Sequence, residues 1–375
     1  MSGIFSGIAA LLWLITCLLP WQAWRNREAL ELDKGAHVDL NTVDLSDITV
    51  VIPARDEAGI IVDTLAALKQ QEQGLSVILV DDESTDGTAE VATNAGLTKL
   101  QLIQSTPLPD GWTGKLWAQE QGLQAVTTPL TLLLDADIYL QAGILAQLKA
   151  KRDTEGLQFV SLMAMLKVES RWEKLLMPAF IYFFKMLYPF ALANNPNSKM
   201  AAAAGGCILV DTEALHAIGG MAAIKGALID DCTLAKHVKQ AGYKTWVGLT
   251  HAVISQRPYI SLTEIWDMVA RTAYTQLFYS KFLLVACTSM MLLMYCLPLL
   301  GILCFAGNAW AFSLFAYIVM SLLYLPTLNF YALNKLWALL IPVIAGLYLL
   351  MTWTSAIRYW RGERSRWKGR IYQKG

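Results

Sequence analysis

The chain has 375 residues, of which 55% are hydrophobic and only 16% are charged, and its formal net charge at pH 7 is zero. So apolar a composition excludes an ordinary water-soluble enzyme, and we expect part of the chain to lie in a membrane. The middle of the sequence has no net positive charge and no basic stripe interleaved with aromatic residues, so nucleic acid is not an expected partner.

The first 24 residues carry no charge and predict a transmembrane anchor over residues 1–24. A cleaved signal peptide is the alternative, but no basic residue precedes the apolar stretch and no clear small-x-small cleavage site follows it. Arg25 and Arg27 come directly after the anchor. By the positive-inside rule, they place the domain that follows in the cytoplasm.

The middle of the chain, residues 47–259, alternates short β-branched runs with amphipathic stretches. This pattern is typical of βαβ units and predicts an α/β domain with a mostly parallel, Rossmann-like sheet. Ligands bind beyond the carboxyl ends of such strands, so the residues there are the first candidates for a site. We expect strands at residues 48–54, 75–82, 99–103, 129–137 and 208–211, and helices at residues 59–71, 85–96 and 116–125.

Two of these strand ends are acidic: Asp81 and Asp82 end the second strand, and Asp135 and Asp137 end the fourth. Residues i and i+2 of an extended chain point to the same side, so the carboxylates of the last pair can converge. Their mutual repulsion favours a divalent cation between them, and a site made of oxygen ligands favours Mg²⁺ or Mn²⁺. For so short a motif taken alone, a solvated turn is the alternative.

Residues 172–195 form an apolar and aromatic stretch inside this middle region. A transmembrane span here would cut the fold in two, so we expect an interfacial helix, or a helix pair, lying on the cytoplasmic leaflet. Lys174 and Lys185 would then lie on its polar side. A buried core helix is the alternative.

Further apolar segments follow at residues 282–357. Residues 282–334 carry no charge and are long enough for two spans with a break near residues 307–309, and residues 336–357 make a third. The tail, residues 358–375, is strongly basic, which favours the cytoplasm. Three spans after a cytoplasmic domain would leave that tail outside, so one segment could be re-entrant or interfacial. We expect a multi-pass protein of the cell (inner) membrane.

Five segments in order carry a resemblance to a known family: VIPARDE, VDDESTDGT, TGKLWA, LLLDAD and GALIDDCTLAKHVKQAGYK. Their order and spacing, over about residues 50–272, resemble the family 2 glycosyltransferases, which have a GT-A fold and use nucleotide-activated sugars. With its terminal apolar segments and the sequence PDGWTGKLWA, the chain looks most similar to the hopene-associated glycosyltransferases, and more distantly to the ceramide glucosyltransferases. The resemblance implies a GT-A domain over residues 47–272.

The resemblance also implies roles for the residues at the strand ends. Asp135 and Asp137 would hold the metal that neutralises the leaving diphosphate, Asp137 most directly. For Lys115, expected near the nucleotide, a solvated lysine at a helix start is the alternative. The residues implied to bind the nucleotide-sugar, expected to be a UDP-sugar, are Pro53, Ala54, Glu57, Asp82, Lys115, Asp135, Gly205, Gly206 and Asp230.

The resemblance places the catalytic base at Asp231. The segment LIDDCTLAKHVKQ matches the family's Glu-Asp pair at a helix start, with Asp230 in place of the more usual glutamate. The positive end of the helix dipole would favour the ionised form that a base needs. The alternative is that both aspartates only cap a helix over residues 232–240.

A second catalytic residue is expected at Arg271. Many membrane-bound relatives carry Gln-x-x-Arg-Trp after the base, but here Met268 and Thr272 stand in place of the glutamine and the tryptophan. The fork geometry of an arginine suits a diphosphate, and a juxtamembrane charge is the alternative. The loss of the other two motif residues favours a single transfer over the processive synthesis of a chain.

The sequence therefore predicts an enzyme: a membrane-anchored, metal-dependent, inverting glycosyltransferase of the hexosyltransferase type. It would move a sugar from a nucleotide-sugar to the hydroxyl of a lipid acceptor, for which a hopanoid-type lipid is one candidate. A processive polysaccharide synthase is one alternative. From a different class, a metal-dependent nucleotidyltransferase also needs carboxylates and a metal at a sheet edge, but PARDEAG is a poor match to its Gly-rich basic loop.

Overall fold

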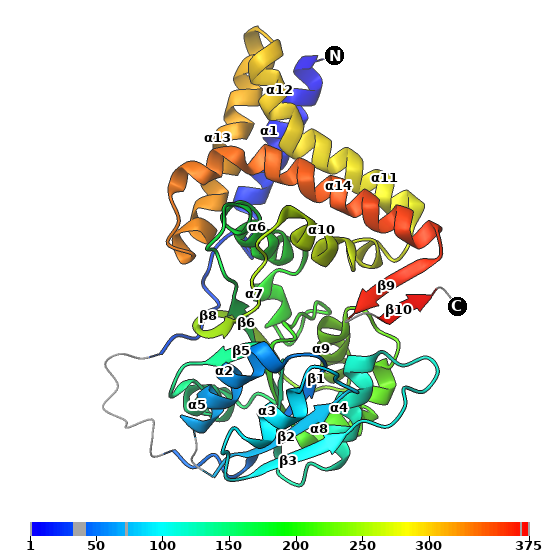
Figure 1. The fold of residues 1–375 in the computed structure, drawn as a ribbon. Coiled ribbons are helices and arrows are strands. Elements are labelled where there is room, and N and C mark those ends of the chain that lie inside the picture. The colour runs from blue at the N-terminus through cyan, green and yellow to red at the C-terminus, as the bar shows by residue number, and fades with distance from the viewer. Residues whose placement is uncertain (1, 33–42, 72–73, 368–369, 374–375) are drawn as a thin grey trace. The chain divides into compact units, whose positions relative to one another are not determined.

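An eight-stranded sheet carries one of the two compact units into which the chain folds in the computed structural model (Figure 1). The structure describes residues 2–32, 43–71, 74–367 and 370–373. The sheet unit comprises Glu28–Lys167 and Phe190–Pro258. The helical unit comprises Met1–Arg27, Val168–Pro189 and Tyr259–Gly375, so a segment from the middle of the sequence belongs with residues from both ends.

The strands of the sheet unit lie in the order β3-β2-β1-β4-β7-β6-β8-β5. Parallel pairing of β1 with β2 and β4, and of β2 with β3, confirms the predicted Rossmann-like α/β sheet. Because β7 is antiparallel to β4 and β6, and β5 is antiparallel to β8, the complete sheet is mixed. The strands are β1 (Ile48–Ala54), β2 (Ser76–Asp81), β3 (Leu100–Gln104), β4 (Leu130–Leu134), β5 (Ile138–Leu140), β6 (Phe159–Met165), β7 (Cys207–Asp211) and β8 (Thr245–Ser255).

Five of these strands fall where the sequence predicts them, whereas β5, β6 and β8 have no counterpart among the predicted strands. The predicted strand at residues 129–137 is too long: β4 ends at Leu134, and the separate strand β5 begins only at Ile138, after the Asp135–Asp137 segment. This division matters for the site, because β5 turns away to pair with β8 instead of continuing along β7.

Both faces of the sheet are covered, because successive residues of its central strands enter different cores. All seven residues of β1 are buried, with Val50 and Ile52 in one hydrophobic cluster and Val51 in the other. A strand buried on both faces is a continuous apolar run instead of an alternation, as the ITVVI segment is. Packing is close: a Cβ on Gly122 of α4 would lie 2.5 Å from the Val51 side chain.

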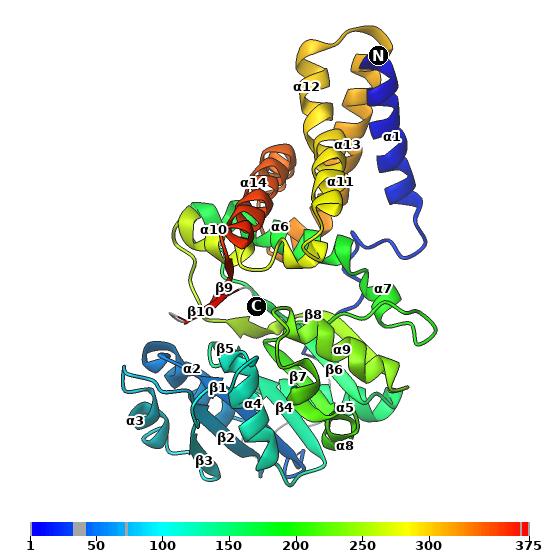
Figure 2. The same cartoon turned by 90° about the vertical axis from the view of Figure 1, so that its right-hand side faces the viewer.

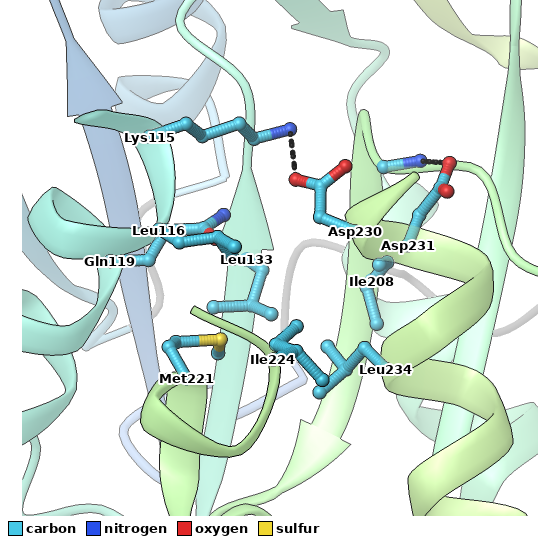
Figure 3. Close-up of a pocket in the computed structure, with 11 residues that line it drawn as sticks. Lys115, Leu116, Gln119, Leu133, Ile208, Met221, Ile224, Asp230, Asp231 and Leu234 are labelled. Carbon is cyan, nitrogen blue, oxygen red and sulfur yellow. Dashed lines mark hydrogen bonds and ion pairs between the residues drawn. The ribbon is translucent and has the colours of Figure 1, made fainter. Parts of the chain in front are cut away.

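Helices α2 and α5 supply side chains to the first cluster, and α4, α8 and α9 supply side chains to the second. Their placement brings the starts of α4 and α9 to the same edge of the sheet as the carboxyl end of β4 (Figure 3). The helices of this unit are α2 (Ala58–Lys69), α3 (Thr88–Thr93), α4 (Gly114–Gln124), α5 (Ile144–Glu155), α7 (Phe190–Ala193), α8 (Thr212–Ala217), the 3₁₀ helix η2 (Gly220–Ile224) and α9 (Asp230–Gln240).

Among its described residues, the helical unit contains three helical stretches that are long and apolar enough to cross a membrane: Lys281–Cys304, Gly307–Phe330 and Lys335–Trp360. The first consists of α11 (Lys281–Met291), the π-helical η4 (Leu292–Cys296) and α12 (Leu297–Cys304). The second is α13 (Gly307–Phe330), and the third joins η5 (Lys335–Leu340) to α14 (Ile341–Trp360). The first break falls immediately before Gly307, whose φ of +60° suits a residue without a side chain.

The N-terminal helix α1 (Ser2–Leu18) is apolar but shorter than these three, and it runs beside α13 within the helical unit (Figure 2). The Ser6 and Ser313 hydroxyls lie 3.0 Å apart between the two helices. Trp13 donates its indole N–H to the Met294 carbonyl at 2.7 Å. The same unit contains α10 (Leu262–Ala270), the 3₁₀ turn η3 (Thr275–Leu277) and a hairpin of β9 (Glu363–Trp367) and β10 (Arg370–Gln373).

The apolar stretch at residues 172–195 forms α6 (Arg171–Leu187) in the helical unit and the short α7 in the sheet unit. A capping box fixes the start of α6, in which Ser170 accepts from the Glu173 amide and Glu173 accepts from the Ser170 amide. The expectation that Lys185 lies on a polar side of α6 is wrong, since the residue is 2% exposed. Its ammonium donates to the Arg25 carbonyl and the Asn26 side chain, which satisfy the buried charge.

Candidate active site

The acidic segment after β4 lies at a junction of three strands. The Asp135 amide donates to the Gly206 carbonyl at 3.0 Å, which ties the end of β4 to the turn before β7. On the other side, the Gln256 amide donates to the Asp137 carbonyl at 2.7 Å, and Ile138 is paired with Ser255 in the β5–β8 ladder. Both aspartates are thus held by backbone hydrogen bonds to strands that come much later in the sequence.

Lys115 reaches this segment from the first turn of α4, where the Thr113 hydroxyl caps the helix. Its ammonium lies 2.8 Å from Asp135 Oδ1 and 3.5 Å from Asp230 Oδ2, the second contact being visible in Figure 3. Burial alone would lower the pKa of Lys115, but the Asp135 and Asp230 carboxylates raise it above its ordinary value. The side chain is 21% exposed, so Lys115 is an internal cation of the site and not a solvated lysine.

Arg257 makes the matching contact on the other side of the segment. Its Nε lies 3.0 Å from Asp137 Oδ2, and its Nη2 lies 2.6 Å from Glu57 Oε1. Glu57 precedes α2, beyond the end of β1, and is only 7% exposed. Arg257 is not among the site residues that the sequence predicts. Arg257 comes two residues after the end of β8, which is where site residues are expected, but β8 itself was not predicted.

Asp230 and Asp231 are the first two residues of α9, and Ile229 is the N-cap residue. The pair thus stands at a helix start, as expected, and the alternative, in which both aspartates only cap a helix that begins at residue 232, is wrong. Asp231 instead accepts from the Gly205 amide at 3.0 Å through Oδ2 and from the Cys232 amide at 2.7 Å through Oδ1. Its carboxylate thus joins α9 to the turn before β7.

The pKa of Asp231 is raised to about 7, first by burial and then by the charge of Asp230. Hydrogen bonds from Cys232 and Gly205 and the charge of Lys115 oppose this rise without cancelling it. The expectation that the helix start favours the ionised form is thus outweighed. A carboxylate with such a pKa can accept a proton at neutral pH and still be ionised in part of the molecules, as a general base must be.

There is little room for a side chain at the two glycines predicted to lie near the nucleotide-sugar. A Cβ on Gly205 would lie 3.3 Å from the Lys115 ammonium and 3.5 Å from the Asp231 Cβ. A Cβ on Gly206 would lie 3.0 Å from the Ile138 Cδ1 atom. Side chains at these positions would push Lys115 or β5 away, so the glycines permit the close approach of α4, α9 and β5.

The carboxyl ends of β1 and β2 are joined directly, since the Asp82 amide donates to the Ala54 carbonyl at 2.8 Å. Arg55, which the sequence analysis passed over, donates to the Asp82 carbonyl at 2.6 Å, and its Nη1 is 3.6 Å from the Asp82 carboxylate. Pro53 and Ala54 are buried within β1, and Asp82 is 1% exposed. The predicted nucleotide residues therefore come together here, with Arg55 at the Asp82 side chain.

The charges and the available oxygens of Asp135 and Asp137 determine whether this pair suits a divalent cation. The pKa of Asp135 is raised by burial, a rise that Lys115 opposes and that the charge of Asp137 reinforces. One oxygen of each carboxylate faces Lys115 or Arg257, which leaves a second oxygen on each for another ligand. No cluster of three or more potential ligand residues occurs among the described residues. Two carboxylates suit Mg²⁺ or Mn²⁺ when phosphate and water complete the shell.

Arg271, the second predicted catalytic residue, belongs to the helical unit. It follows α10 as its C-cap residue, donates its amide to the Asp267 carbonyl at 3.0 Å, and is exposed. The sheet unit therefore brings together every other predicted site residue, and the role of Arg271 stays a prediction.

Comparisons with known proteins agree with this geometry. Residues 49–219, most of which lie in the sheet unit, match the family model described as "Glycosyl transferase family 2". A 4,4'-diaponeurosporenoate glycosyltransferase from Staphylococcus aureus (strain USA300) is 38% identical over 92 residues, which are 24% of this chain and 24% of that protein. The chain thus matches about a quarter of the length of this curated relative.

A solved structure extends the likeness of the fold. The mannosyltransferase PcManGT from Pyrobaculum calidifontis, in complex with GDP-Man and Mn²⁺, superposes with a TM-score of 0.56 and 18% sequence identity. The match covers 95% of this chain and 99% of that one. At this identity the likeness establishes a shared GT-A fold.

Proposed function

We propose that the protein is a membrane-anchored, inverting glycosyltransferase that moves a sugar from a nucleotide-sugar to a lipid acceptor. The observation that carries this proposal is the convergence at one sheet edge of Asp135, Asp137, Lys115 and Asp231. Sugar transfer from a nucleoside diphosphate needs charge stabilisation for the leaving group and a base for the acceptor proton, positioned on one substrate. These four side chains are a cation, two carboxylates with free oxygens, and a carboxylate with a pKa of about 7.

Asp135 and Asp137 would hold Mg²⁺ or Mn²⁺, which when bound would neutralise charge on the leaving diphosphate. Lys115 would bind the same diphosphate as a fixed positive charge, since its raised pKa keeps it protonated at neutral pH. The β1 and β2 ends, with Pro53, Ala54 and Asp82, would bind the nucleotide. A UDP-sugar is the expected donor.

Asp231 would accept the proton of the acceptor hydroxyl as the new glycosidic bond forms and the bond from sugar to phosphate breaks. The electrons of the broken bond remain on the diphosphate. A single displacement with inversion is what the family resemblance implies, and one base, Asp231, is sufficient for it. Arg271 would assist at the diphosphate, as the family resemblance implies.

Two observations support a lipid acceptor and a membrane location. Three helical stretches are long and apolar enough to cross a membrane, and α1 packs against one of them as an anchor would. The Staphylococcus relative acts, by its name, on 4,4'-diaponeurosporenoate, a lipid-like carotenoid acid. The proposed arrangement is a multi-pass protein of the cell membrane with the sheet unit in the cytoplasm, since Arg25 and Arg27 follow α1.

The test is sugar transfer by the detergent-solubilised full chain, with Mn²⁺ or Mg²⁺, a panel of UDP- and GDP-sugars, and a membrane lipid extract supplemented with hopanoids and carotenoid acids. The expected product is a lipid with one added sugar. If no sugar is transferred from any of these donors, the proposal is contradicted. A ladder of products would identify the processive synthase instead, and transfer of a nucleotide to a sugar phosphate would identify the nucleotidyltransferase.

A further inference from the structure

A small pocket lies beneath Lys115 and the two aspartates of α9 (Figure 3). Lys115, Asp230 and Asp231 lie at one end of it, and apolar side chains such as Leu133 and Ile224 line the rest. Its free volume of about 10 Å³ accommodates one water-sized group. All of its lining residues belong to the sheet unit.

Gln119 is the one polar side chain among the residues that line the deeper part of this pocket. It comes one helical turn after Lys115 in α4, so both side chains project from the same face of the helix. The residue is 4% exposed, and within the described part of the chain its amide group makes no hydrogen bond to protein. Its amide atoms are not among the fully buried side-chain atoms without a partner in the described part of the chain, so the amide keeps some accessible surface, where a polar group can bind it.

Its neighbours on α4 are engaged elsewhere. Glu120 accepts from the Met221 amide at 2.8 Å, and Gln121 binds Thr106 and Ser105 at the far side of the helix. Gln119 therefore differs from the adjacent polar residues of the same helix in having a pocket, not a protein group, in front of its amide.

We infer that Gln119 binds a hydroxyl group of the transferred sugar and thereby helps to select which sugar the donor carries. This inference rests on the proposed function. The base must reach the acceptor oxygen that attacks the sugar, so the sugar lies beside Asp231, at the mouth of the pocket that Gln119 lines. An amide both donates and accepts, as a hydroxyl does, whereas a phosphate oxygen only accepts and is better served by Lys115. The pocket has room for one such group and not for a whole ring.

The experiment compares the affinities of a sugar donor and of its parent nucleotide for the full chain in detergent with Mn²⁺. Isothermal titration calorimetry would use two pairs of probes: UDP-glucose with UDP, and GDP-mannose with GDP. The variant Gln119→Leu removes the amide and keeps the volume. Gln124→Leu makes the same change at an exposed position of α4 and is the matched control.

We expect Gln119→Leu to weaken binding of the preferred nucleotide-sugar about three- to tenfold, as the loss of one hydrogen bond predicts, and to leave the parent nucleotide unaffected. Gln124→Leu should change neither affinity. If the leucine variant does not fold, Gln119→Asn, which keeps the amide but withdraws it by one methylene, should show the same selective loss.

Equal weakening of both ligands would show that Gln119 only supports the fold, and unchanged affinities would show that it binds only a buried water. Either result overturns the inference and leaves the proposed function standing. Failure of the wild-type chain to bind any of the four probes would instead contradict the proposed function, and the inference would fall with it.

Discussion

The two sides of the Asp135–Asp137 segment are built from the same kinds of groups in different proportions. On the Lys115 side, one ammonium contacts the carboxylates of Asp135 and Asp230, and Asp231 lies next to them. On the Arg257 side, one guanidinium serves Asp137 and Glu57, each through a separate nitrogen. On the Arg257 side, two carboxylates share one cation, and each has its own hydrogen bond to it. On the Lys115 side, three carboxylates share one cation.

This difference assigns different tasks to the two sides. Burial and, after it, the charge of Asp230 raise the pKa of Asp231 to about 7, so the Lys115 side can exchange a proton near neutrality. The Arg257 side has a fork of donors with fixed geometry, which holds Asp137 and Glu57 at a defined distance. We therefore expect variants on the Lys115 side to change the chemistry, and variants on the Arg257 side to change position and stability.

The largest effect is expected for Asp231→Asn on the Lys115 side. Removal of a general base lowers rates about 10²- to 10⁴-fold, and kcat for sugar transfer should fall by this amount while the affinity for the nucleotide stays within a few-fold. The matched control is Asp63→Asn, at an exposed position of α2. A variant with wild-type kcat would rule out Asp231 as the base.

Asp137→Asn removes a carboxylate shared by the proposed metal site and Arg257. We expect activity to fall about 10²-fold, because the charge on the leaving diphosphate is then less well stabilised. Binding of Mn²⁺, measured by the loss of its free electron paramagnetic resonance signal on titration with protein, should weaken as well. Unchanged Mn²⁺ binding would place the metal elsewhere.

Arg257→Gln should have a smaller effect on activity, about tenfold, together with lower stability. Its loss leaves the Asp137 and Glu57 carboxylates without their charged donor, and hydrogen bonds to charged groups contribute about 1.5–3 kcal/mol each. Thermal unfolding of the detergent-solubilised chain should therefore show a lower Tm, with Arg257→Lys in between because it keeps the charge and loses the fork. A loss of kcat as large as that of Asp231→Asn would mean that the two sides do not differ in task.

Asp230→Asn should change the pH dependence of kcat/KM more than its maximal value. A base must be deprotonated, so kcat/KM should rise with pH up to about 7, the pKa of Asp231, and then level off. The charge of Asp230 is the second cause of that raised pKa, and its removal should move the rising limb about one unit towards acid. A limb at an unchanged pH would mean that another group controls it.

The smallest expected effect is that of Asp231→Asn on stability: this variant should be more stable than the wild type, although it is less active. Since the pKa of Asp231 is raised from 3.8 to about 7 by folding, the folded chain binds this proton more tightly than the unfolded chain. The stabilisation is complete below pH 3.8 and is lost as the pH rises to about 7. Asp231→Asn does not ionise, so its Tm at pH 8 should exceed that of the wild type by a few degrees, whereas Asp63→Asn should leave Tm unchanged.

Local patterns were sufficient for much of the fold. The run ITVVIPA predicts β1 at the bounds that the structure has, and the uncharged segments near the C-terminus predict the long apolar helices. Strands β5, β6 and β8 were not predicted, and neither was the antiparallel direction of β7. Whether a strand is parallel or antiparallel depends on which strands become its neighbours, and the residues of a strand do not indicate those neighbours.

The site divides in the same way. The sequence, with its family resemblance, identified Asp135, Asp137, Lys115 and Asp231 from motifs that each lie within a few residues. Arg257 is separated from Asp137 by 120 residues, and only the pairing of β5 with β8 brings them together. The short apolar run and the acids that end it are local properties of the chain, so the sequence by itself was sufficient to predict the kind of chemistry that we propose. The partner of each acid, and the raised pKa of Asp231, depend on burial and on charges from distant segments, which only the tertiary structure decided.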